Sequence, residues 1–360
     1  MTTVTKRRAI VAIPVVAVLA AGAVAVTTSQ AQPRKMNATS ASKSATTTQV
    51  FASGGTLTAP DDIALLDGHV FVAYQNGVGS KGETSPAGQK ASTVVEYTKV
   101  GQKVAQWNLT GKIDGMASDA QGHRIVATVN EDGNSSLSTI SPSAGGGAVR
   151  HYSYSPSPLP HGGGTDSIAA VGGALYVTAS APAADKDGKT YSKPALYRVA
   201  LSGTSATATS VLTDNATATD AKSGKSVTLN LSDPDSSLLM PAASPRFAGD
   251  LQLDSQGDSE QVFLKNPGTT QQKATVLKLP TQVDDTAVAT SSHGTLFVVD
   301  GKADRVIEIS GTFQPGEAFA SVPDDSTNLN GNLVRLNLTT GAVVPFQTGF
   351  KSPKGLLFVG

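Results

Sequence analysis

The feature that most constrains the fold is a motif that recurs at a constant interval. It consists of an acidic residue, a short apolar stretch, a Gly-containing turn and a β-rich strand. It opens at Asp62, Asp114 and Asp166, so both intervals are 52 residues. Equal spacing of about 50 residues is typical of propeller blades that contain four short strands. The sequence therefore predicts an all-β fold, a β-propeller.

The number of blades follows from the later copies of the motif. These open at Asp250 and Asp285, and the last opens at Lys354. Six copies predict six blades of about four antiparallel strands, with five and seven blades as alternatives. The interval from Asp166 to Asp250 is longer than the others, and the excess coincides with residues 214–245, which we interpret as a long loop insertion.

Closure of the ring requires a strand from the beginning of the fold. The last copy of the motif opens only six residues before the end of the chain, at Lys354. The closing blade must therefore take a strand from the N-terminal side, near residues 50–52, which also protects two open sheet edges.

The N-terminus has the pattern of an export signal. Lys6, Arg7 and Arg8 precede an uninterrupted apolar run over residues 9–26, and Ala31 ends a small-residue cleavage site. We interpret residues 1–31 as a secretory signal peptide and the protein as secreted. An uncleaved membrane anchor is the alternative, because 18 apolar residues are borderline for spanning a bilayer.

The segment after the signal and the overall charge limit the partners. Residues 32–48 contain almost no large apolar side chain and predict a disordered tether before the propeller domain, residues 49–360. Without residues 1–31 the chain has 25 basic and 28 acidic residues, a balance that does not attract nucleic acid or anionic lipid. We expect a monomer that binds neither nucleic acid nor membrane after cleavage. The absence of Cys excludes disulfides and thiolate metal sites.

Acidic residues open the motifs where the inner strands of a propeller begin, near the axis. The sequence therefore predicts that the motif carboxylates converge at one mouth of the channel. Several carboxylates suit a hard cation such as Ca²⁺ or another divalent ion. In the alternative interpretation each Asp only accepts hydrogen bonds from its own turn. The candidate ligand-binding residues are Asp62, Asp114, Asp166, Asp250 and Asp285.

Residues 114–122, Asp-Gly-Met-Ala-Ser-Asp-Ala-Gln-Gly, resemble a segment of the senescence-marker-protein/gluconolactonase family of six-bladed propellers and of NHL-repeat propellers. In the lactonases, the Asp that opens this segment is a ligand of the catalytic divalent metal. The resemblance implies this role for Asp114 and, at the matching motif positions, for Asp62 and Asp166. The Gly-Glu-Gly-Pro and Pro-Asn-Gly segments that supply other ligands in those enzymes are absent from the sequence.

Residues 160–166, Pro-His-Gly-Gly-Gly-Thr-Asp, form the most unusual local sequence. Three glycines allow the backbone to approach a ligand closely. His161 is therefore a candidate acid, base or ligand-binding residue at the channel mouth. A solvated His in a flexible turn is the alternative.

The sequence contains regular repeats but no complete set of catalytic residues. This favours a secreted scaffold with a ligand- or protein-binding face at the channel mouth. The alternative function is a divalent-metal-dependent hydrolase of the lactonase or esterase type, in which the metal would activate water.

Overall fold

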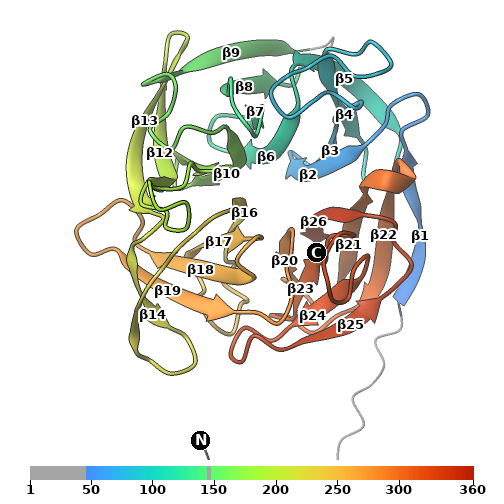
Figure 1. Cartoon of the computed structure of the whole chain (residues 1–360). Coiled ribbons are helices and arrows are strands. Elements are labelled where there is room, and N and C mark those ends of the chain that lie inside the picture. The colour runs from blue at the N-terminus through green and yellow to red at the C-terminus, as the bar shows by residue number, and fades with distance from the viewer. Residues whose placement is uncertain (1–45, 144–146) are drawn as a thin grey trace, which may run out of the picture. The chain divides into compact units, whose positions relative to one another are not determined.

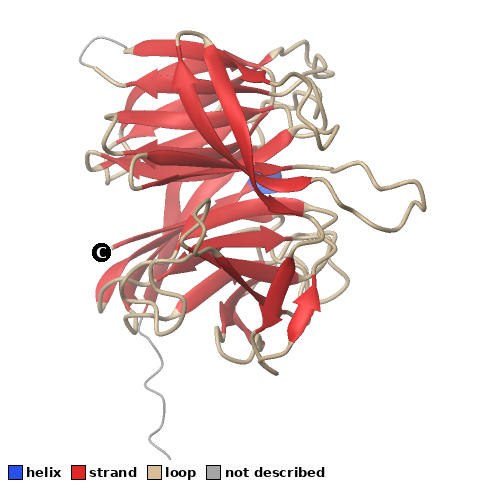
Figure 2. Ribbon diagram, turned by 90° about the vertical axis from the view of Figure 1, so that its left-hand side faces the viewer, coloured by secondary structure: helices blue, strands red, loops and turns tan. Residues whose placement is uncertain are grey.

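Strands form nearly all of the regular structure. The computed structural model describes residues 46–143 and 147–360. Its one helical element in those ranges is a single 3-10 turn, η1 (Gly301–Ala303), drawn blue in Figure 2. The predicted signal peptide and residues 32–45 of the predicted tether lie outside the described residues. Within the described ranges, no helix is long and apolar enough to cross a membrane.

Within the described ranges, the strands other than β14 and β15 group into six four-stranded units, here called blades 1 to 6 (Figure 1). Each blade is given from its innermost strand outwards. Blade 1 contains β2 (Pro60–Leu66), β3 (His69–Tyr74), β4 (Ala91–Tyr97) and β5 (Lys103–Thr110). Blade 2 contains β6 (Ile113–Asp119), β7 (Arg124–Val129), β8 (Ser136–Ser141) and β9 (Ala148–Ser155). Blade 3 contains β10 (Thr165–Val171), β11 (Ala174–Ala179), β12 (Pro194–Ser202) and β13 (Ser205–Thr213).

The second half of the ring has the same plan. Blade 4 contains β16 (Pro234–Leu239), β17 (Leu251–Ser255), β18 (Glu260–Lys265) and β19 (Lys273–Lys278). Blade 5 contains β20 (Thr286–Val288), β23 (Ala318–Ser321), β24 (Leu333–Leu336) and β25 (Val343–Gln347). Blade 6 contains β26 (Pro353–Val359), β21 (His293–Asp300), β22 (Arg305–Thr312) and β1 (Thr46–Ser53).

The innermost strands close a ring around a central axis. In the order β2, β6, β10, β16, β20 and β26, each lies against the next, and β26 lies against β2 (Figure 1). Blades 2 and 3 are also joined at their outer edges, where β9 and β13 pair in parallel. This arrangement is an all-β propeller.

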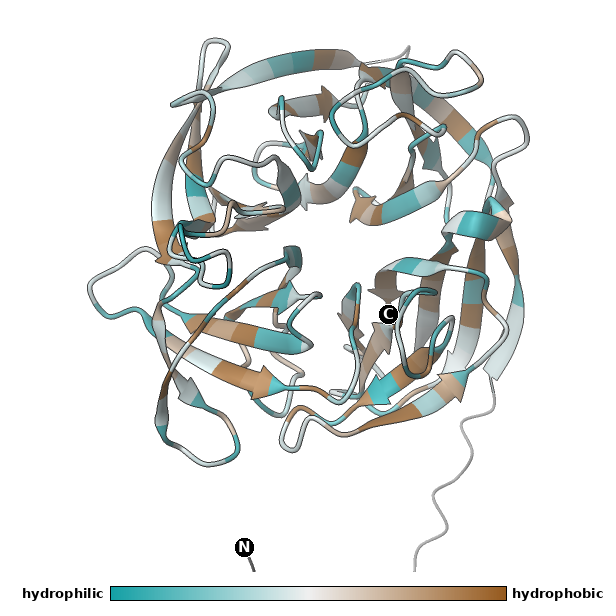
Figure 3. Cartoon of the chain, in the orientation of Figure 1, coloured by the Kyte–Doolittle hydropathy of each residue, from teal (hydrophilic) through white to brown (hydrophobic). Residues whose placement is uncertain are grey.

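Apolar side chains fill the spaces between neighbouring blades. There are six buried clusters, one for each pair of adjacent blades, and their residues recur as brown bands along the strands in Figure 3. Alternating side chains of one strand point to opposite faces of its sheet. On β2, for example, Ile63 packs toward blade 6 and Ala64 packs toward blade 2. The blades are therefore held together by burial on both faces.

Blade 6 is closed by strand β1, which comes from the opposite end of the chain. Its residues pair with β22 from Thr46↔Gly311 to Ser53↔Arg305. The closing strand was expected near residues 50–52, and it begins earlier. The predicted tether is therefore wrong for residues 46–48, because three consecutive Thr residues suit an extended strand and find a partner edge.

Blades 5 and 6 exchange strands in a way that the motif did not reveal. After β20 the chain forms β21 and β22 of blade 6, and only then returns to form β23, β24 and β25 of blade 5. The sequence motif that opens at Asp285 therefore spans two blades.

The segment 214–245 is an insertion that contains regular structure. It includes a hairpin of β14 (Thr217–Asp220) and β15 (Ser226–Thr228), which extends blade 4 because β14 pairs with β19. It also contains β16, the innermost strand of blade 4. Its polar composition concealed that strand.

Candidate functional site

The inner strands share a β-bulge near their first residues. On β2, Pro60 pairs with Tyr74 and Ile63 pairs with Val72. Between these two pairs β2 therefore contains one residue more than β3. The same irregularity occurs at the start of β6, β10, β16 and β26. A bulge changes the direction of a side chain and is common beside functional sites. Here it directs equivalent residues from separate strands toward the axis.

One position inside the bulge carries a charged residue in every blade, and we call this set the axial ring. On β20 the position is assigned from hydrogen bonds, because Asp285 contacts its neighbours as Asp62 does on β2. Five members are carboxylates and the sixth is an amine. In blade order they are Asp61, Asp114, Asp166, Asp235, Asp284 and Lys354.

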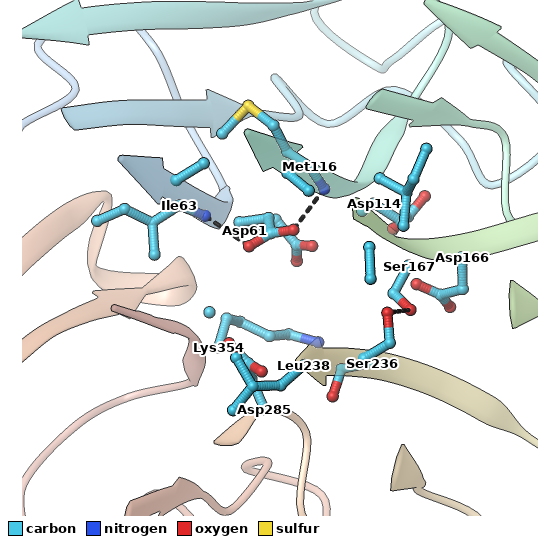
Figure 4. Close-up of a pocket in the computed structure, with 18 of the residues that line it drawn as sticks. Asp61, Ile63, Asp114, Met116, Asp166, Ser167, Ser236, Leu238, Asp285 and Lys354 are labelled. Carbon is cyan, nitrogen blue, oxygen red and sulfur yellow. Dashed lines mark hydrogen bonds between the residues drawn. The ribbon is translucent and has the colours of Figure 1, made fainter. Parts of the chain in front are cut away.

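The residues of the axial ring line one cavity of about 350 Å³. Figure 4 shows Asp61, Asp114, Asp166 and Lys354 around this space, each from a different strand. Apolar side chains from the same inner strands, including Leu65, Leu238 and Leu357, line the rest of it. Part of the cavity wall is therefore acidic and part of it is apolar.

Two amines partly neutralise the axial ring. Lys112 Nζ lies 2.9 Å from Asp114 Oδ1 and also pairs with Glu131, and Lys354 Nζ lies 3.2 Å from Asp284 Oδ2. Asp114 Oδ2 and Asp235 Oδ2 are buried and have no hydrogen-bond partner among the described residues. The cavity thus keeps an excess of acceptors over donors.

Burial raises the pKa of every carboxylate in the axial ring. The pKa of Asp61 rises to about 6, and those of Asp114, Asp166 and Asp235 rise well above their ordinary value. Burial is the largest cause in each case, because a charged carboxylate loses its hydration there. The neighbouring Asp235 carboxylate adds to the rise in the pKa of Asp166. A positively charged ligand would relieve this penalty.

Asp62 and Asp285 each directly follow a member of the axial ring, and their carboxylates accept hydrogen bonds from backbone amides. Asp62 Oδ1 accepts from Ile63 N at 2.6 Å, and Oδ2 accepts from Met116 N on the next blade at 2.5 Å. Asp285 makes the same pair of contacts, with Thr286 N at 2.6 Å and Leu356 N at 2.7 Å. Both line the cavity, but their carboxylates accept from backbone amides. The alternative interpretation expected contacts within each residue's own turn, and each carboxylate also joins its strand to the next blade.

Asp250 lies outside the cavity. It precedes β17, which runs antiparallel to β16, so the start of β17 lies beside the end of β16. The sequence motif identified the second strand of blade 4 as the innermost one. Asp235 takes the place assigned to Asp250, and the Pro-Asp pair at 234–235 matches the pair at 60–61.

His161 also lies outside the cavity, and it is fully buried. Its Nδ1 lies 2.8 Å from the Tyr197 hydroxyl, and its Nε2 contacts the carbonyl oxygen of Gly164. Since that carbonyl can only accept, Nε2 carries the proton and Nδ1 accepts from Tyr197. Burial lowers the pKa of His161, so the neutral ring is a fixed structural link and not a solvated turn residue.

The metal-ligand set expected from the sequence is not formed. Nowhere in the described ranges do three His, Cys, Asp or Glu side chains lie where they could hold one metal ion. Of the expected ligands Asp62, Asp114 and Asp166, the first already uses both oxygens on backbone amides. The residues present therefore do not fit that metal centre.

Gly115 follows Asp114 and allows two inner strands to approach. A Cβ atom at this position would meet the carbonyl oxygen of Asp166 and Cα of Ser167 well inside contact distance. We expect Gly115→Ala to lower the free energy of unfolding by about 2 kcal/mol, because overpacking forces the strands apart. Chemical denaturation measures this. Ser118→Ala on the same strand should change it by less than about 0.5 kcal/mol, and equal effects would contradict the close approach.

Fold and site together define a propeller with an acidic pocket on its axis. No family model and no curated protein matches the chain. Among solved structures, the chain is similar to a streptogramin B lyase, with 14% identity, 86% of this chain and 90% of that chain covered, and a TM-score of 0.43. It is similar to the periplasmic gluconolactonase of Pseudomonas aeruginosa, with 14% identity, 84% and 88% covered, and a TM-score of 0.46. It is also similar to a putative 6-phosphogluconolactonase from Bacteroides uniformis, with 10% identity, 81% and 85% covered, and a TM-score of 0.42.

Proposed function

We propose that this is an exported ligand-binding protein whose axial pocket binds a small organic cation. The observation that carries the proposal is the axial ring itself, in which five inner strands place a carboxylate at the same position. Buried charges are paired or bind a counter-charge. The two amines beside the ring, Lys112 and Lys354, contact only Asp114 and Asp284 among its five carboxylates. A cationic ligand supplies the missing charge.

The chemistry of the lining favours an ammonium group on a short apolar chain. An ammonium group has three donors, and Asp114 Oδ2 and Asp235 Oδ2 are acceptors without a hydrogen-bond partner among the described residues. Leu65, Leu238 and Leu357 offer apolar surface for the chain of the ligand. A cavity of about 350 Å³ is within the range that small-molecule sites occupy.

A metal-dependent lactonase or esterase is the second candidate function. It is favoured by the motif resemblance at Asp114, whose Oδ2 is a buried acceptor without a hydrogen-bond partner among the described residues. Because no three-ligand group exists among the described residues, we derive no reaction step through a metal. The two candidates differ in which cation the pocket binds.

Calorimetric titration tests the proposal. The probes are 1,5-diaminopentane and butylamine, and pentanoate is the control, since it has a similar apolar chain but a negative charge. We expect the amines to bind and the carboxylate not to bind. Asp166→Asn and Asp235→Asn should each weaken amine binding at least tenfold, because each removes a charge-assisted contact. Asp250→Asn is the matched control and should leave the dissociation constant unchanged.

The same titration at two pH values separates the ring from other acidic surfaces. Amine binding should be tighter at pH 8 than at pH 5, since the pKa of Asp61 is about 6 and only its ionised form attracts a cation. Absence of amine binding would refute the proposal. Binding of Ca²⁺, Mn²⁺ or Zn²⁺ that Asp114→Asn abolishes, together with lactone hydrolysis, would establish the second candidate instead.

A further inference from the structure

A second set of buried polar side chains lies between blades 4 and 5, beside the axial cavity, and includes no member of the axial ring. We call it the Asp254 cluster. Asp254 and Gln261 are opposite each other on β17 and β18, and Gln252 lies two residues before Asp254, so all three share one face of the sheet. The members are Gln252, Asp254, Gln261, Thr286 and Ser236.

The face that carries the Asp254 cluster points toward blade 5. The alternate residues Leu253 and Val262 pack in the apolar cluster between blades 3 and 4. The polar residues therefore face the other way, toward β20, where Thr286 Oγ1 donates to Asp254 Oδ2 at 3.1 Å. Gln252, Asp254 and Gln261 are each 0% exposed.

Hydrogen bonds satisfy only part of the Asp254 cluster. Asp254 Oδ2 also accepts from Ser236 Oγ at 3.0 Å, and Gln261 Nε2 donates to Thr286 Oγ1 at 2.8 Å. Four buried atoms have no hydrogen-bond partner within the described chain: Asp254 Oδ1, Gln261 Oε1, and Oε1 and Nε2 of Gln252. Three of the four are oxygens, each of which costs free energy when left unpaired.

The carboxylate in this cluster has no basic partner. No Lys, Arg or His of the described residues forms an ion pair with Asp254. Burial raises the pKa of Asp254 to about 7, and the neighbouring side chains Gln252, Gln261, Ser236 and Thr286 oppose the rise. At pH 8 the carboxylate is therefore surrounded by neutral polar groups only. Buried charges in proteins are normally paired or bound to a metal ion.

We propose that the Asp254 cluster binds one monovalent alkali cation, with sodium as the preferred ion. One carboxylate and neutral amide and hydroxyl oxygens balance a single positive charge, whereas a divalent ion would leave a buried excess of one. Oxygen ligands are those that hard cations take. A water molecule would supply only two hydrogens and no charge. Ser236 and Thr286 also line the axial cavity, which gives the ion a route inward.

Thermal unfolding in chloride salts at constant ionic strength and pH 8 tests this proposal. Replacing CsCl by NaCl should raise the unfolding temperature by roughly 4 °C, in a saturable way, because sodium binds only the folded state and caesium is too large for a closed cluster. Asp254→Asn should abolish the difference between the salts. Asp214→Asn removes another buried carboxylate, outside the cluster, and should leave the difference intact.

Two further measurements keep the outcome decisive. Gln252→Met retains the carboxylate and removes an amide oxygen. It should raise the sodium concentration that gives half of the stabilisation about tenfold. This variant tests the site even if Asp254→Asn does not fold. A crystal structure determined in NaCl should show an ion beside Asp254 Oδ1 whose ligands are all oxygen atoms. Equal stability in both salts, or a water molecule at that position, would overturn the proposal. The axial variants Asp166→Asn and Asp235→Asn should keep the sodium effect, which separates this site from amine binding.

Discussion

Starting the chain at Gly54, which removes strand β1, should lower the unfolding temperature by at least about 10 °C. Seven residue pairs join β1 to β22, and their loss leaves the β22 edge open. The deletion also removes Phe51, which packs edge-on against Phe297 at 4.8 Å and Tyr97 at 5.8 Å. Loss of a buried Phe alone costs about 3–5 kcal/mol, a large share of the stability of a typical domain. Calorimetry measures the shift.

The matched control for this deletion starts at Ser44 and retains β1, since residues 44–360 form one compact unit. It should unfold at the temperature of the full chain. Phe51→Ala should reproduce about half of the loss, whereas Val50→Ala should have little effect because Val50 is exposed. If the Gly54 and Ser44 chains unfold together, β1 does not close the ring in solution.

Much of the architecture was predictable because propeller blades repeat in sequence. The constant interval between Asp62, Asp114 and Asp166 indicated radial repetition, and the short distance from the last motif to the chain end indicated a closing strand from the N-terminal side. The exchange of strands between blades 5 and 6 was not predictable. Each strand there has an ordinary β pattern, and nothing in the pattern records its partner.

The sequence predicted carboxylates at one axial opening, and the residues that line the axial cavity differ from the predicted ones by errors of register. Asp61 belongs to the axial ring where the motif indicated Asp62, and Asp284 belongs to it where the motif indicated Asp285. Two consecutive Asp residues stand at the start of β2 and directly before β20, and apolar periodicity does not distinguish the members of such a pair. Asp114 and Asp166 are followed by Gly and Ser, so no such ambiguity arose. Lys354 was recognised as a motif start, but its role beside Asp284 depends on contacts that only the ring creates.

Asp235 was missed for a different reason. Its strand, β16, contains two Ser residues and follows a polar insertion, so it lacks the apolar run that identified the other inner strands. The Pro residue before the ring position was the usable signal, because blades 1, 4 and 6 share it at Pro60, Pro234 and Pro353. Pro favours the first residue of a strand, where no ladder donor is required.

A large pH-dependent effect on stability should come from Asp214, which follows β13. This side chain is 0% exposed, and neither of its carboxylate oxygens has a hydrogen-bond partner among the described residues. Burial raises the pKa of Asp214 to about 7. The backbone amide of Lys193 opposes this rise, and the carboxylates of Asp258 and Asp185 add to it. The ordinary pKa of an Asp, near 4, applies to the unfolded chain.

Between these two pKa values the folded protein binds more protons than the unfolded chain, so its stability falls as the pH rises. Asp214 alone should lower the free energy of unfolding by roughly 2–3 kcal/mol from pH 5 to pH 8. Asp61 shifts in the same direction. Urea denaturation at the two pH values should therefore show a protein that is more stable in mild acid, the reverse of ordinary acid denaturation.

Asp214→Asn isolates this contribution, since an amide has the size of the carboxyl group and does not titrate. It should stabilise the protein by roughly 4 kcal/mol at pH 8 and by roughly 1.4 kcal/mol at pH 5, and flatten the dependence on pH. Asp220→Asn is the control, because hydrogen bonds from Ser223 lower the pKa of this exposed carboxylate and it stays ionised over the whole interval. An unchanged slope in Asp214→Asn would mean that water or a cation reaches this carboxylate, and that the space beside β13 is open to solvent.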